Sequence, residues 1–182
     1  MKKIFFLALV LSAFTAMGQS ARRLEILFLG DNGHHKPMER LPSIMAAVGD
    51  KGVNFTYTDQ LEDLTLKNLN KYDALLIFAN WDSIPPHLEK DLLAYVSSGK
   101  GILPIHCASY CFRNSAEYVK MVGGQFWRHT MDSIEAKIIQ PDHFIMKGLR
   151  PFKVVDETYL HDHLQDDNNV LAEREIKSDQ FK

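Results

Sequence analysis

Hydrophobic segments, some continuous and one alternating with polar residues, recur along the chain from residue 24 onward. They are separated by stretches with apolar residues three and four positions apart, which is the spacing of an amphipathic helix. Strands are predicted at residues 24–30, 53–58, 73–79 and 101–106. Helices are predicted at residues 37–51, 85–96 and 108–122. Strands and helices that alternate in this way imply right-handed crossovers and a parallel sheet, so the predicted fold class is α/β.

The pattern is weaker after the Gly123-Gly124 pair. Residues 134–139 and 152–156 have strand-like sequences, and residues 170–172 look like the start of another strand. The last residues, up to Lys182, offer nothing that would complete a sheet. We therefore expect a single domain of residues 19–182 that is incomplete at its C-terminus, as in a fragment or the front part of a longer protein.

The first 18 residues have the features of a secretory signal peptide. Lys2 and Lys3 precede an apolar stretch, residues 4–14, that is too short to span a bilayer. Small residues then precede Gln19, where cleavage is expected. The alternative is an uncleaved membrane anchor. We expect a secreted protein, periplasmic in a Gram-negative cell, with no stable membrane insertion after cleavage.

The charge balance of the chain is close to neutral, with a formal net charge of -2. Nucleic-acid binding needs a concentrated basic face, which this sequence does not provide, so nucleic acid is not an expected partner. The two cysteines, Cys107 and Cys111, lie four residues apart in a predicted helix, where the geometry rarely suits a disulfide. The fold is therefore expected to depend on its hydrophobic core.

Polar and aromatic residues follow three of the predicted strands at their carboxyl ends. In open parallel sheets, ligands bind beyond this edge of the sheet. The residues are Asp31 and His34 after the first strand, Trp81 after the third, and His106 and Cys107 after the fourth. We expect the functional site at this edge.

The turn that follows the fourth strand is the most informative of these positions. In α/β folds a sharp strand-to-helix turn presents its residue above the sheet, beside the free amides of a helix N-terminus. A thiol presented there, such as Cys107, would have a lowered pKa and be reactive. Alternatively, His106 bonds a backbone group and Cys107 packs as a small apolar residue.

Four segments of the chain, in this order, resemble the ThuA-like (trehalose utilisation) family. They are residues 71–80, 95–109, 123–129 and 156–159. The resemblance covers nearly all of residues 24–173. It implies the class I glutamine amidotransferase-like fold, a flavodoxin-like, doubly wound, mostly parallel sheet with helices on both faces. It also implies a place in carbohydrate utilisation.

One position departs from the amidotransferase pattern. The resemblance implies a nucleophilic Cys at the strand-to-helix turn, and His106 stands there in this sequence. Cys107 is one residue late and should point elsewhere. We therefore expect no glutamine amidotransferase activity, and we expect function to depend on His106 and not on Cys107.

Several histidines and one glutamate fall near predicted loops and strand ends. His34, His106, His129 and Glu157 offer a nitrogen–oxygen site for a divalent metal such as Zn²⁺, or an acid–base cluster without metal. No local spacing such as His-x-x-x-His supports the metal. His106, His129 and Glu157 are expected to meet in one cleft, provided that their strands run parallel.

These observations predict an exported protein that acts on or binds a carbohydrate, as a hydrolase or isomerase if it is an enzyme. His106, His129 and Glu157 are the predicted catalytic residues, with His106 as general base or metal ligand and Glu157 as its partner. The predicted substrate-binding residues are Asp31, His34, Trp81 and Tyr159. Aromatic faces stack on sugar rings, although core packing is the alternative for each aromatic residue.

Two other functions remain open from the sequence. One is a noncatalytic sugar-binding or partner-docking module of a larger protein or assembly, and the other is a Cys107-dependent hydrolase or amidotransferase. A homo-oligomer or a fused partner domain is compatible with each of them.

Overall fold

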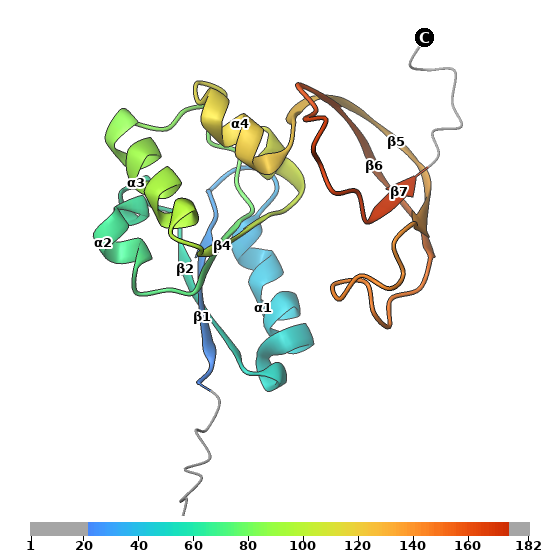
Figure 1. Ribbon diagram of the computed structural model, residues 1–182, viewed down its shortest axis with the longest axis horizontal. Helices are drawn as coiled ribbons and strands as arrows, with labels where there is room; N and C mark the ends of the chain where they lie inside the picture. The colour runs from blue at the N-terminus through green and yellow to red at the C-terminus, as the bar shows by residue number, and fades with distance from the viewer. Residues whose placement is uncertain (1–21, 175–182) are drawn as a thin grey trace, which may run out of the picture.

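The computed structural model describes residues 22–174, so the predicted signal peptide lies outside the described residues. A parallel sheet of four strands forms the first part of the fold, in the order β2-β1-β3-β4 (Figure 1). Its strands are β1 (Leu24–Leu29), β2 (Val53–Thr58), β3 (Ala74–Ile77) and β4 (Gly101–Pro104). The four predicted strands are therefore present and parallel, as the alternation of elements indicated.

Helices cover both faces of this sheet. The α-helices are α1 (Pro37–Val48), α2 (Leu66–Leu69), α3 (Pro86–Ser97) and α4 (Ala116–Val122), and the short 3-10 helices are η1 (Gly49–Lys51), η2 (Leu61–Leu64) and η3 (His106–Ser109). Leu41 and Ile44 of α1 pack against Phe28 on one face. Helices α2 and α3 cover the other face. The doubly wound α/β architecture predicted from the sequence is confirmed.

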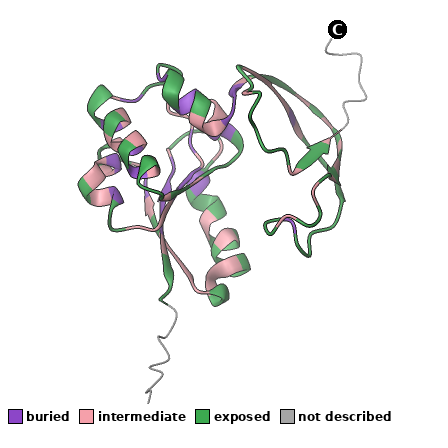
Figure 2. Cartoon of the chain, viewed as in Figure 1, coloured by how far each residue is buried: buried purple, intermediate pink, exposed green. Residues whose placement is uncertain are grey.

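The main core lies between the parallel sheet and helices α2 and α3. Leu27 of β1 lies beside Leu75 of β3, and both side chains are almost fully buried against Leu88 and Tyr95 of α3. Alternate residues of the same strands, such as Phe28, face α1. Burial on both faces explains why β1 and β3 are almost continuously hydrophobic. Buried residues are concentrated in this part of the molecule (Figure 2).

The helix predicted at residues 108–122 is wrong in its first half. The short helix η3 ends at Ser109, and α4 begins only at Ala116. Between them, Phe112 has a φ of 54°, a left-handed conformation that an α-helix does not accommodate. The Oγ of Ser115 then accepts a hydrogen bond of 3.0 Å from the amide of Tyr118, so Ser115 caps the start of α4.

A second sheet of three strands, in the order β6-β5-β7, follows α4 (Figure 1). Its strands are β5 (Gln125–Ile138), β6 (Phe152–Asp162) and β7 (Ala172–Arg174). The strands predicted at 134–139 and 152–156 are thus parts of longer ones, and they pair antiparallel. The expectation of parallel strands in this region is wrong, because residues 139–151 only reverse the chain and contain no crossover helix.

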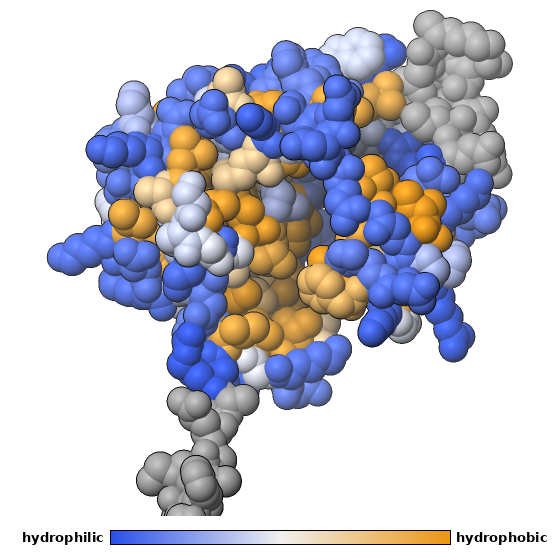
Figure 3. All heavy atoms as spheres, in the orientation of Figure 1, coloured by the Kyte–Doolittle hydropathy of each residue, from blue (hydrophilic) through white to orange (hydrophobic). Residues whose placement is uncertain are grey.

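Part of the hydrophobic surface remains open to solvent. On the face drawn in Figure 3, hydrophobic side chains are visible in the hollow between the parallel-sheet unit and the second sheet. Leu103 and Ile105, on and after the edge strand β4, are 42% and 39% exposed. Within the described part of the chain, the helices are all too short or too polar to cross a membrane.

Candidate active site

His106 occupies the turn that ends β4. Its φ is 52°, in the left-handed region, while Ile105 before it is still extended. The amide of Ile105 donates a hydrogen bond of 2.9 Å to the carbonyl of Ile77, which fixes the end of β4 against β3. A non-glycine residue held in this conformation at a strand end is typical of functional turns.

The structure brings His106, His129 and Glu157 together. The Nε2 of His106 lies 3.5 Å from Oε2 of Glu157, and the Nε2 of His129 lies 3.8 Å from Oε1 of the same carboxylate. Glu157 lies inside β6 and not at a strand end. In the antiparallel pairing, His129 lies opposite Tyr159, so His129 and Glu157 share one face of the sheet two residues from each other's partner.

Tyr159 lies between the two histidines. Its ring stacks on that of His106, with the centroids 4.8 Å apart, and on that of His129 at 5.7 Å. Its hydroxyl lies 3.3 Å from Nε2 of His106. Burial, followed by the negative charge of Glu157, raises the pKa of the Tyr159 hydroxyl, which is therefore protonated and able to donate a hydrogen bond.

His35 is a member of the site that was not predicted from the sequence. One ligand atom each from His35, His106 and Glu157 lie within 4.8 Å of one another. The prediction named its neighbour His34, whose ring is 4.0 Å from that of His35 and whose side chain is exposed. The adjacent histidines were the available signal, but the sequence of a loop does not show which of two neighbours faces the sheet.

Burial lowers the pKa of both His35 and His106. For His106, the nearby negative charge of Glu157 opposes this effect without reversing it. Both imidazoles are therefore predominantly neutral at neutral pH. A neutral imidazole can accept a proton or bind a metal, and both roles need the ring in this state.

Asp31 and Trp81, two predicted substrate-binding residues, hold loops together. The carboxylate oxygens of Asp31 accept hydrogen bonds from the amide of Gly33 at 2.7 Å and from the amide of Asn80 at 2.5 Å. The indole N–H of Trp81 donates to the carbonyl of Gly30 at 3.0 Å, and its ring packs against the core. These contacts shape the edge of the sheet, and a direct role with substrate stays a prediction for both residues.

Cys107 packs as a small apolar side chain. It is 1% exposed, and burial raises the pKa of its thiol to about 12. Cys111 is also buried, and its thiol donates to the carbonyl of Ala79. Both cysteines are free. The chemistry of a thiol with a lowered pKa is therefore not what this turn provides, because η3 buries Cys107 while it presents His106.

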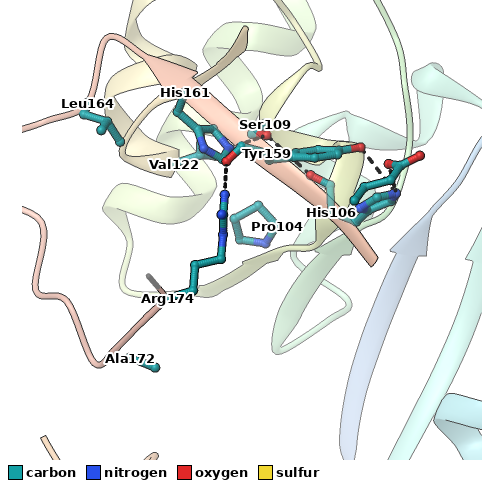
Figure 4. A pocket seen from close by; sticks show the side chains of 10 residues that line it. Pro104, His106, Ser109, Val122, Tyr159, His161, Leu164, Ala172 and Arg174 are labelled. Atoms are coloured by element: carbon teal, nitrogen blue, oxygen red, sulfur yellow. Dashed lines mark hydrogen bonds and ion pairs between the residues drawn. The ribbon is translucent and has the colours of Figure 1, made fainter. Parts of the chain in front are cut away.

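A cavity of about 680 Å³ opens beside His106 (Figure 4). Glu157 and Tyr159 line it near His106, and Figure 4 shows His161, Ser109 and Arg174 farther along it. The Nε2 of His161 lies 3.0 Å from Oγ of Ser109, and the Arg174 guanidinium donates to the carbonyl of Tyr159. A smaller cavity of about 240 Å³ lies on the other side of Tyr159. Its lining includes His34, His35, Asn80 and His129.

The doubly wound sheet with a functional turn after β4 places the chain in the class I glutamine amidotransferase-like fold. The family model for ThuA, described as trehalose utilisation, matches residues 25–181, and the chain belongs to this family. Comparison with curated proteins finds no match.

Three solved structures have a similar fold. A ThuA-like protein from Bacteroides uniformis ATCC 8492 superposes with a TM-score of 0.71 at 17% identity, covering 87% of this chain and 71% of that one. A ThuA-like protein from Parabacteroides merdae ATCC 43184 gives 0.62 at 16% identity, covering 76% and 63%. A GMP synthase protein from Thermoplasma acidophilum gives 0.50 at 17% identity, covering 83% and 73%.

Proposed function

We propose that this chain is an exported ThuA-like protein that acts on or binds a carbohydrate in the cleft formed by His106, His129, Glu157 and Tyr159. Membership of a family described by trehalose utilisation supports a carbohydrate-related role. The observation on which the proposal rests is the contact between His106 and Glu157, whose Nε2 and Oε2 atoms are 3.5 Å apart at the side of the cavity.

The composition of the cleft suits a sugar. Sugar rings offer apolar faces for aromatic stacking and hydroxyl groups for hydrogen bonds. Tyr159 and Phe126 form an aromatic wall, with ring centroids 4.5 Å apart. Glu157 and His161 add hydrogen-bonding groups along the same strand. A volume of about 680 Å³ lies within the range of small-molecule sites.

Proton transfer is the chemistry that the cluster supports if the protein is an enzyme. The neutral His106 ring is suited to accept a proton from a sugar hydroxyl or an acidic C–H group. Glu157 stabilises the resulting imidazolium, and the Tyr159 hydroxyl is a donor for developing negative charge on oxygen. Hydrolysis and isomerisation both need groups of this kind.

A noncatalytic docking module is the alternative with a specific observation in its favour. The exposed side chains of Leu103 and Ile105 at the β4 edge leave an apolar strip for another domain or protein. A Cys107-dependent hydrolase has no such support, because the thiol is buried and its pKa is raised to about 12.

Titration of trehalose and a panel of neutral mono- and disaccharides into the mature chain tests the proposal by calorimetry. We expect at least one sugar to bind with one site per chain, and Glu157→Gln to weaken it by about tenfold or more, as loss of a hydrogen bond to a charged group predicts. Glu62→Gln is the matched control, since Glu62 also lies 3.5 Å from a histidine, His87, but away from the cleft. Equal affinities in both variants, or no sugar bound by the folded chain, would contradict the proposal.

Export predicts a defined mature N-terminus. When the gene is expressed in a Gram-negative host, N-terminal sequencing of the envelope fraction should begin at or near Gln19, because the apolar stretch before it is too short to remain as an anchor. Recovery of an intact Met1 in that fraction would contradict cleavage.

A further inference from the structure

Three side chains from distant segments meet at the carboxyl edge of the parallel sheet. His35 comes from the loop after β1, His106 from the turn after β4, and Glu157 from the middle of β6. One ligand atom of each lies within 4.8 Å of the other two. The rings of His35 and His106 are 4.8 Å apart at an angle of 82°, so they do not stack face to face.

Two polar atoms in this cluster are buried without a hydrogen-bond partner among the described residues. They are Nδ1 of His35 and Oε2 of Glu157. Buried polar atoms are nearly always satisfied in folded proteins, by protein groups, by water or by a bound ion. Both atoms belong to the same cluster, and together with His106 they supply two nitrogens and one anionic oxygen.

We propose that His35, His106 and Glu157 bind a divalent transition-metal ion such as Zn²⁺. Two histidines and one glutamate form a recurrent catalytic zinc set, in which the fourth position stays open for water or substrate. Zinc lies about 2.0–2.2 Å from such ligands, so ligand atoms in a tetrahedral site are about 3.3–3.5 Å apart. The His106–Glu157 pair, at 3.5 Å, already has this spacing.

The proposed ligand set differs from the one expected from the sequence at two positions. His35 replaces its neighbour His34, which is not in the cluster. His129 lies 3.8 Å from Oε1 of Glu157, whereas Oε2 faces His106. His129 therefore positions the glutamate from its far oxygen, as the outer partners of metal ligands commonly do.

The metal site deepens the proposed function, and it rests on the same cleft. His106 and Glu157 line the larger cavity, and His35 lines the smaller one, so an ion between them is reached from the space where the sugar would lie. A divalent ion there polarises a carbonyl or hydroxyl oxygen of the sugar. Zinc binding is measured without sugar, so failure of the metal site and failure of carbohydrate binding are separate results.

The experiment uses the mature chain, stripped of metal with a chelator and titrated with Zn²⁺ alone. We expect one equivalent to bind with a Kd below about 1 μM and to raise the Tm. His35→Ala, His106→Asn and Glu157→Gln should each weaken zinc binding more than about 100-fold, beyond the usual effect of an outer partner. Asn is chosen at position 106 because it tolerates the left-handed backbone.

A matched control variant is His163→Asn. His163 also has a left-handed backbone, with a φ of 51°, and its Nδ1 lies 3.0 Å from a carboxylate oxygen of Asp162, but it lies outside the cluster. It should bind zinc as the unchanged chain does, and so should His34→Ala. Circular dichroism of the metal-free variants checks folding, and because the three ligands lie in different segments, a variant that fails to fold leaves two others. Wild-type protein that binds no zinc, or ligand variants that bind it as tightly as the control, would overturn the site.

Discussion

Replacing His106 with Asn is expected to reduce sugar turnover by about 100-fold or more, whereas Cys107→Ala keeps most of it. A positioned acid–base group contributes factors of about 10² to 10⁴, and loss of a metal ligand is at least as damaging. His106 is presented beside Glu157 and Tyr159, while Cys107 is 1% exposed with a raised pKa. Sugar consumption followed by NMR measures the effect for each variant.

Two further variants separate chemistry from folding in this comparison. His163→Asn repeats the same substitution at a left-handed histidine outside the cleft, and Cys111→Ala repeats the loss of a buried thiol. Both should retain turnover. Loss of turnover in Cys107→Ala at an unchanged Tm would return the function to the thiol, and full turnover in His106→Asn would remove His106 from the site.

The parallel sheet was predictable because burial on both faces leaves a strong mark on the sequence. Leu27 and Leu75 lie in runs with hardly a polar residue, and glycine or proline punctuation separates these runs from the helices. The start of α4 was not predictable in the same way. Phe112 has a left-handed backbone although a phenylalanine carries no sequence signal for it, and the apolar spacing continues across the break.

The site was predictable in part, since polar residues at the carboxyl edge of a parallel sheet are natural candidates. His106 followed from its place after β4. The positions of His129 and Glu157 depend on the register of β5 against β6, in which Met131 lies opposite Glu157. That register is set by side-chain packing and by a bulge between Phe126 and Arg128, and neither is visible in a sequence.

The second sheet must therefore be held against the first for the site to exist. Gly123, at the end of α4, is one place where this happens. Its carbonyl accepts hydrogen bonds from the side-chain amide of Asn168 at 2.7 Å and from the amide of Gln165 at 3.0 Å. The segment after β6 is thus fastened to the helix that precedes β5, and a change at Gly123 should reach the cleft.

Gly123→Ala is expected to lower the free energy of unfolding by about 2–3 kcal/mol. Its φ of 89° is left-handed, and a non-glycine residue there costs about 1–3 kcal/mol. An added Cβ would also lie 2.3 Å from Oδ1 of Asn168. That side chain must move and give up its hydrogen bond to the Gly123 carbonyl, which costs about 1 kcal/mol more. Urea denaturation measures the total.

Gly99→Ala separates the two contributions. Gly99 also follows a helix, α3, and has a φ of 91°, but a Cβ added there meets no atom within 4 Å among the described residues. It should lose only the backbone part, about 1 kcal/mol less than Gly123→Ala, and should leave zinc and sugar affinity unchanged. Gly123→Ala should weaken both affinities, because the displaced Asn168 loosens the segment that follows β6 and with it the position of Glu157. Equal losses of stability in the two variants, with ligand affinity unchanged in both, would show that the contact between Gly123 and Asn168 does not hold the second sheet in place.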